Sequence, residues 1–182
     1  MNYGKGIIEL ASQFAGLTEV RQNAAWDDLA TKGVDERAKK LRAILEAAGH
    51  QPGWPYCMSF CRAIYIEAYR GTEHEKTVRT ILSASVILSW NNCKKQNLTN
   101  KTPKEGAIFF LQKGTSGYGH AGLVVADLGD TMKTVEGNTS AQPAKGEADR
   151  NGDGVYFKKR STAIIGAKGT GLHLLGFLNP FE

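Results

Sequence analysis

The spacing of apolar residues changes near residue 100, and this change constrains the fold more than any other feature of the sequence. Before it, apolar residues recur at helical spacing over residues 5–15, 36–48, 56–70 and about 77–90. After it, short apolar runs predict about five strands, at residues 107–112, 120–126, 132–136, 155–160 and 172–178. Short links between the runs favour antiparallel pairing. We therefore predict an α+β fold with N-terminal helices packed on a mostly antiparallel sheet.

The chain has 182 residues, which suits one domain with a substantial core. Neither the helical part before about residue 100 nor the sheet part after it would bury much apolar surface alone, so we expect a single domain over residues 1–182. Residues 17–34 are expected to be irregular apart from a short helix over 24–30. Residues 91–103 are polar without periodicity and are expected to form a connector.

The formal net charge of +5 favours an anionic partner such as nucleic acid, a phospholipid surface or an anionic cell wall. The basic residues are scattered, and no basic–aromatic motif of nucleic-acid recognition occurs, so we expect only a weak attraction to a polyanion and no nucleic-acid binding. No apolar run reaches membrane-spanning length, and residues 1–30 lack the apolar core of a signal peptide. We expect a protein made in the cytoplasm without a cleaved signal and not inserted into a membrane.

The three cysteines cannot all pair within one chain. Cys57 and Cys61 lie one helical turn apart and Cys93 is isolated, which is neither a disulfide framework nor a CxxC zinc pattern. Free thiols suit a protein made in a reducing compartment.

Cys57 stands in a stretch, Gly53–Phe60, that has the features of a turn opening a helix. Pro55 suits the first helical position because its missing N–H would have no partner there, and Gly71 provides a stop. Cys57 would then lie beside free backbone N–H groups at the positive end of the helix dipole, which lowers a thiol pKa and favours the nucleophilic thiolate. A buried structural cysteine is the alternative from this stretch alone.

His120 has the most suggestive position of the four histidines. It follows Gly117-Tyr118-Gly119 and opens the apolar run 121–125, which predicts a histidine at the entrance of a buried strand. Such a side chain can lean over a helix terminus and act as general base for a cysteine, or it can be a strand-edge histidine satisfied by backbone groups. His74 lies in a charged run and is expected to be solvated.

Glu136 and Asn138 follow in the next strand pattern and are two residues apart, so an extended chain would point both to one face. One could hold the second imidazole nitrogen, and the other could donate a hydrogen bond to an oxyanion. An ordinary turn is the alternative, with Glu136 at the end of a surface strand.

The segment Asp149–Gly154 begins like a calcium loop. Arg160 stands where the closing glutamate of such a loop would be, and the residues after Gly154 read as a strand. We interpret the segment as a tight turn and expect no metal and no cofactor.

Short motifs recur along the chain in a familiar order, at Trp54–Phe60, Pro103–Phe110, Gly119–Val124, Val135–Thr139 and Gly176–Leu178. This order resembles the CHAP family (cysteine, histidine-dependent amidohydrolases/peptidases) of the papain-like NlpC-type superfamily, many of whose members are phage endolysins or bacterial wall hydrolases. The resemblance implies a papain-like fold, with Cys57 as nucleophile and His120 as base. It also implies that Glu136 orients His120 and that Asn138 is an accessory polar residue.

The resemblance implies a peptidoglycan hydrolase that cuts an amide bond through an acyl-enzyme, as an N-acetylmuramoyl-L-alanine amidase or as a stem-peptide or cross-bridge endopeptidase. We expect a monomer of the phage-lysin type that acts on the bacterial wall after release, injection or export. The alternatives are a catalytically silent wall-binding or structural member of the fold, and a cysteine hydrolase of the same fold acting on a protein or lipid.

Overall fold

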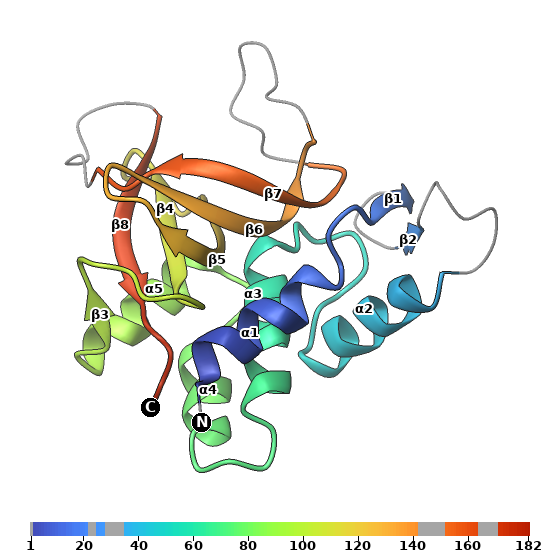
Figure 1. Ribbon diagram of the computed structural model, residues 1–182, viewed down its shortest axis with the longest axis horizontal. Coiled ribbons are helices and arrows are strands. Elements are labelled where there is room, and N and C mark those ends of the chain that lie inside the picture. The colour runs from blue at the N-terminus through green and yellow to red at the C-terminus, as the bar shows by residue number, and fades with distance from the viewer. Residues whose placement is uncertain (1, 22–24, 28–34, 142–151, 164–170) are drawn as a thin grey trace.

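The computed structural model describes residues 2–21, 25–27, 35–141, 152–163 and 171–182. Most of the helices come from the N-terminal half of the chain, and the long strands come from the C-terminal half (Figure 1). The N-terminal helices pack on an antiparallel sheet, so the predicted α+β class is confirmed.

The described residues form five helices: α1 (Tyr3–Ser12), α2 (Glu36–Ala47), α3 (Cys57–Ala68), α4 (Glu75–Ile81) and α5 (Val86–Lys95). Asp35 caps α2 by accepting the Arg37 backbone N–H at 2.7 Å. The single helix predicted over about 77–90 is wrong, because the chain is extended at Leu82 and starts a new helix at Val86. Ser85 caps that new helix through the Leu88 backbone N–H at 3.3 Å.

The sheet contains eight described strands in the order β2-β1-β7-β6-β5-β4-β8-β3. Their bounds are β1 (Thr18–Arg21), β2 (Ala25–Asp27), β3 (Thr99–Asn100), β4 (Ile108–Lys113), β5 (Gly119–Asp127), β6 (Thr131–Thr139), β7 (Gly154–Ser161) and β8 (Leu172–Leu178). Every pairing among them is antiparallel, and β4 to β8 are the predicted strands.

The three short strands differ from the sequence prediction. Residues 25–27 pair with β1 where a short helix was expected, and Thr99–Asn100 pair with β8 inside the expected connector. The connector is also shorter than predicted, because α5 continues to Lys95. Strands of four residues or fewer are too short for alternation to identify them.

Two apolar clusters lie against the sheet, since successive strand residues point to opposite faces. The larger cluster joins the helices to strand residues Ile108, Phe110, Ala121, Leu123, Val135 and Val155. The smaller cluster comprises Ala107, Phe109, Leu111, Val124, Met132, Leu174 and Phe177. Helix α3 packs against β5 and β6, which carry His120 and Glu136. This packing brings the helix that begins at Cys57 to the strands that carry the other predicted site residues.

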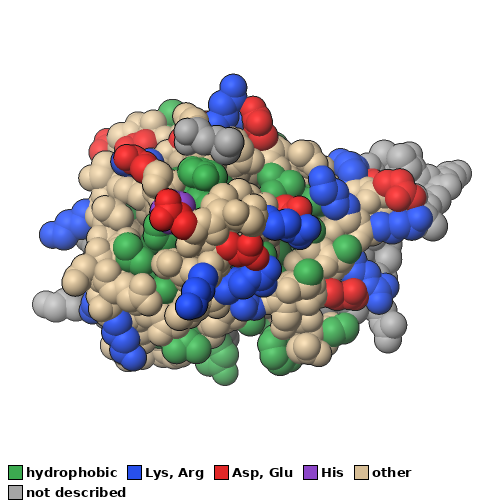
Figure 2. Space-filling model, turned by 90° about the horizontal axis from the view of Figure 1, so that it is seen from below, with side chains coloured by type: hydrophobic (Ala, Val, Ile, Leu, Met, Phe, Trp, Pro, Cys, Tyr) green, Lys and Arg blue, Asp and Glu red, His purple; other side chains and the backbone are tan. Residues whose placement is uncertain are grey.

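Charged side chains of both signs are interspersed on the face seen from below (Figure 2). Ion pairs along the helices contribute to this mixing, for example Arg42 with Glu46 and Arg79 with Glu75, each at 2.8 Å. Within the described part of the chain, no helix has both the length and the apolar character that crossing a bilayer requires.

Candidate active site

Cys57 is the first residue of α3, so its backbone N–H has no acceptor within the helix. Its thiol lies at the positive end of the helix dipole and is only 6% exposed. Tyr56 is the N-cap, so Pro55 lies before the cap and not at the first helical position that the sequence predicts. Helix α3 therefore starts at Cys57 itself.

The pKa of Cys57 is lowered although burial, the largest influence, acts to raise it. A hydrogen bond and the charge of His120 lower this pKa, and the backbone groups of Ala121 and Met58 add to the effect. Cys61, one turn further along α3, is fully buried, and its burial raises the pKa of its thiol well above the usual range. Cys57 is therefore more easily ionised than an ordinary thiol, whereas Cys61 stays protonated.

His120, the second residue of β5, is anchored through its Nε2 atom, which lies 2.8 Å from Oε2 of Glu136. The other ring nitrogen, Nδ1, is left for the hydrogen bond with Cys57. Burial acts to lower the pKa of His120, but hydrogen bonds and charges from Cys57 and Glu136 raise it to about 9. The imidazolium form is therefore favoured at neutral pH.

Two glycines of β5 make room for this arrangement. A Cβ on Gly119 would lie 2.2 Å from the carbonyl oxygen of Leu111. A Cβ on Gly122 would lie 2.6 Å from Cγ of Glu136 and 2.7 Å from Cε1 of Phe109. Because Gly122 has no side chain, the Glu136 side chain can lie against β5 at this point and reach His120.

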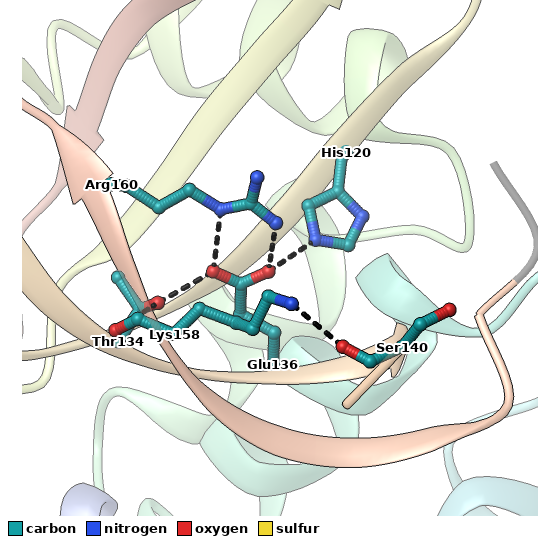
Figure 3. A network of polar contacts seen from close by, with 6 residues as sticks. All are labelled: His120, Thr134, Glu136, Ser140, Lys158 and Arg160. Atoms are coloured by element: carbon teal, nitrogen blue, oxygen red, sulfur yellow. Dashed lines mark hydrogen bonds and ion pairs between the residues drawn. The ribbon is translucent and has the colours of Figure 1, made fainter. Parts of the chain in front are cut away.

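Glu136 is fully buried, and both of its carboxylate oxygens accept hydrogen bonds (Figure 3). Oε1 accepts from Oγ1 of Thr134 at 2.5 Å and from Nε of Arg160 at 2.8 Å. Oε2 accepts from Nη2 of Arg160 at 2.5 Å, in addition to its bond with His120. Burial acts to raise the pKa of Glu136, but Arg160 and His120 lower it to about 2. Cys57, His120 and Glu136 therefore form one continuous row of interacting groups.

Asn138 follows Glu136 by two residues in β6. It has a left-handed backbone (φ 54°) and sits where the β6–β7 register shifts between Gly137 and Thr139. This bulge interrupts the alternation that would have placed Asn138 on the same face as Glu136. Its side chain is buried, and its Oδ1 atom has no hydrogen-bond partner among the residues that the structure describes.

A cleft of about 330 Å³ opens beside Cys57. It is lined by Trp54, Pro55, Cys57, Ala84, Ser85, Val86, Gly117 and Gly119. The break between α4 and α5, which the sequence analysis missed, supplies one wall. Trp54 is 48% exposed, so an aromatic surface is available to a ligand beside the thiol.

Sequence reasoning missed Arg160 and Thr134 as partners of Glu136. Arg160 ends the run Lys158-Lys159-Arg160, a composition typical of a solvated surface, but its side chain is 27% exposed and binds a buried carboxylate. Alternation along β6 places Thr134 on the face of Glu136 and could have identified it. Identifying Arg160 requires the register of β6 against β7, which the long connection between Thr139 and Gly154 does not fix.

Two further expectations concern features outside this row. His74 is not simply solvated, because its ring stacks on Phe181 with centroids 5.2 Å apart and its Nε2 lies 3.1 Å from the carbonyl oxygen of Glu182. The first half of the predicted turn Asp149–Gly154 lies outside the described residues. Among the residues that are described, no cluster of three or more His, Cys, Asp or Glu side chains is arranged to hold a metal ion.

Comparison with known families gives a match to the CHAP domain over residues 47–138. The matched range contains Cys57, His120, Glu136 and Asn138. CHAP domains are typically cysteine-dependent amidohydrolases or peptidases, and the match implies an amidase or peptidase that acts on peptidoglycan. A search of curated proteins gives no match.

Proposed function

Because the chain belongs to the CHAP domain family, we propose that it hydrolyses an amide bond of peptidoglycan with Cys57 as the nucleophile. The observation that carries the proposal is the row from Cys57 through His120 to Glu136, which begins at a helix terminus and opens to a cleft. A thiol with a lowered pKa, a histidine with a raised pKa and an anchoring carboxylate are the parts that cysteine-based acyl transfer requires.

The first step is attack of the Cys57 thiolate on the carbonyl carbon of the scissile amide. Negative charge then develops on the carbonyl oxygen, and the backbone N–H of Cys57 is a donor free to receive it at the start of α3. Asn138 is proposed as an accessory polar residue for this oxyanion or for the loop that it closes. Its buried position supports such a role.

The second step is protonation of the leaving amine by the imidazolium of His120, which breaks the C–N bond and leaves an acyl-enzyme on Cys57. The now neutral His120 takes a proton from water as this water attacks the thioester, the acyl group leaves as a carboxyl product, and the thiolate–imidazolium pair is restored. Glu136 keeps one ring nitrogen anchored throughout, so that the other remains directed at the reacting atoms.

The proposed substrate bonds are the amide between N-acetylmuramic acid and L-alanine and the amides of the stem peptide or cross-bridge. All are amides that the same chemistry can cut, and the walls of the cleft beside Trp54 would select among them. We further propose that the protein acts as a released, phage-type lysin. The net charge of +5 supports attraction to an anionic wall.

Mass spectrometry of purified peptidoglycan after digestion tests the proposal. We expect a new amine and a new carboxyl end at one amide position, which names the bond that is cut. The Cys57→Ser variant should keep the fold and release no such ends. Wall lysis retained by Cys57→Ser would rule out Cys57 as the nucleophile. Wild-type protein that binds the wall and leaves it intact would indicate a silent wall-binding protein, and wild-type protein that neither binds nor cuts the wall would direct the search to protein or lipid amides and esters.

A further inference from the structure

Arg160 provides two of the hydrogen bonds that hold Glu136. Its Nε and Nη2 atoms donate to Oε1 and Oε2 at 2.8 and 2.5 Å, in the forked geometry of a bidentate guanidinium–carboxylate pair. The Arg160 side chain is 27% exposed and that of Glu136 is 0% exposed, so the pair reaches from a partly solvated edge into the interior. The arginine therefore contacts the anchoring carboxylate directly.

We infer that Arg160 is a positioning residue for the proposed hydrolysis: it keeps Glu136 ionised and directed at His120, and through His120 it supports the Cys57 thiolate. The inference rests on the proposed function and adds to it a residue outside the matched range, which ends at residue 138. Its action is indirect, because Arg160 bonds to Glu136 and Glu136 bonds to His120.

The charges of the four groups support this inference. In the active form they alternate along the row, from the Cys57 thiolate and the His120 imidazolium to the Glu136 carboxylate and the Arg160 guanidinium. The row is then neutral overall. Without the guanidinium, the buried row would carry a net negative charge, and burial would favour uptake of a proton by Glu136 or Cys57. A guanidinium does not lose its proton in proteins, so it maintains the balance at any working pH.

The geometry also fixes the orientation of the carboxylate. Figure 3 shows the Arg160 guanidinium and the His120 ring side by side against the carboxylate, while Thr134 holds its other edge. Among the described residues, the ionisable groups that act on Glu136 are His120 from β5, Arg160 from β7 and Cys61 from α3. Lys158, on the same face of β7 as Arg160, donates its Nζ to the carbonyl oxygen of Ser140 instead (Figure 3). Cys61 stays protonated and adds no charge, so Arg160 and His120 are the cations that compete for the carboxylate.

The test compares Arg160→Met with Lys159→Met. Lys159 is the preceding residue of β7 and is exposed, so its variant removes the same charge from the same strand without touching Glu136. The readout is the rate of Cys57 alkylation by iodoacetamide as a function of pH. We expect the acid limb of this profile to move up in pH in Arg160→Met. The move should be smaller than the roughly 1–3 units by which a close opposite charge shifts the pKa of a carboxyl that it contacts, because Arg160 acts on Cys57 through Glu136 and His120. The Lys159→Met profile should superimpose on that of the wild type.

A folded Arg160→Met protein with the wild-type alkylation profile would overturn the inference. If Arg160→Met does not fold, Arg160→Lys decides, because it keeps the charge but loses the fork. We expect Arg160→Lys to lower kcat on peptidoglycan by roughly 10-fold or more, because the Glu136 carboxylate would be misoriented. An Arg160→Lys protein with the kcat and the alkylation profile of the wild type would contradict the inference. Alkylation needs no substrate. A shifted profile in a protein that does not cut peptidoglycan would therefore refute the proposed function and leave the inference on Arg160 standing.

Discussion

Glu136 is the residue whose surroundings determine the chemistry of its neighbours. Its carboxylate has no solvent contact, and the partners that keep it ionised come from β5, β6 and β7. The motifs around Cys57, His120 and Glu136 single out these residues in the sequence, and the fold brings them together. Arg160 could not be predicted in the same way. An arginine in a basic run is typical of an exposed surface, and only the pairing of β7 with β6 shows that this one contacts Glu136.

The ionisation of His120 depends on Glu136, and this dependence can be measured in the pH–rate profile. We expect Glu136→Gln to lower the rate by roughly 10²–10⁴-fold, the usual contribution of general acid–base catalysis. The imidazolium loses its anionic partner, so the alkaline limb, set by a His120 pKa of about 9, should move down in pH. Asn138→Ala should lower the rate and leave this limb in place. The opposite result, a limb moved by Asn138→Ala and not by Glu136→Gln, would exchange the two roles.

At the scale of elements, the long strands were predictable and the joints between elements were not. Strands β4 to β8 carry apolar runs long enough to recognise, but the break at residues 82–85 required reading Ser85 as a helix cap inside an apolar stretch. The bulge at Asn138 likewise cannot be seen in a sequence that continues a strand pattern. These joints matter for function, because one lines the cleft and the other carries a predicted site residue.

Close packing of β5 against β6 makes a further element-scale prediction. Gly122→Ala would place a Cβ 2.6 Å from Cγ of Glu136, so we expect a loss of about 1–3 kcal/mol in the free energy of unfolding. Displacement of the carboxylate should lower activity as well. Gly6→Ala is the matched control, because Gly6 is exposed in α1 and a Cβ there meets nothing within 4 Å. Chemical denaturation should show Gly6→Ala to be at least as stable as wild type; a Gly122→Ala protein of wild-type stability and activity would contradict the packing argument.

At the scale of the whole molecule, a net charge of +5 is spread over a surface of mixed sign instead of forming one basic patch on the face seen in Figure 2. Such a distribution supports a general, screened attraction to a polyanion and not a specific anion site. The row of Cys57, His120 and Glu136 is buried and should be affected little by ions in solution.

Salt should therefore separate attraction to the wall from chemistry. We expect wall lysis to weaken as ionic strength rises, because exposed charges are screened over about 10 Å at 0.1 M salt. Turnover of a short soluble stem peptide should change much less. Equal salt sensitivity on the two substrates, measured with the same enzyme preparation, would remove the role assigned to the net charge.

The most direct test of the site is to label the cysteines with iodoacetamide at neutral pH and follow lysis in parallel. Peptide mass spectrometry identifies the modified residue. We predict that Cys57 is alkylated first and that activity falls in proportion to its modification, since its pKa is lowered and it opens to the cleft. Cys61 and Cys93 should react slowly, because burial raises the pKa of each thiol, that of Cys93 to about 12. Full lysis by a protein alkylated at Cys57, or faster labelling of Cys61, would contradict the assignment of the nucleophile.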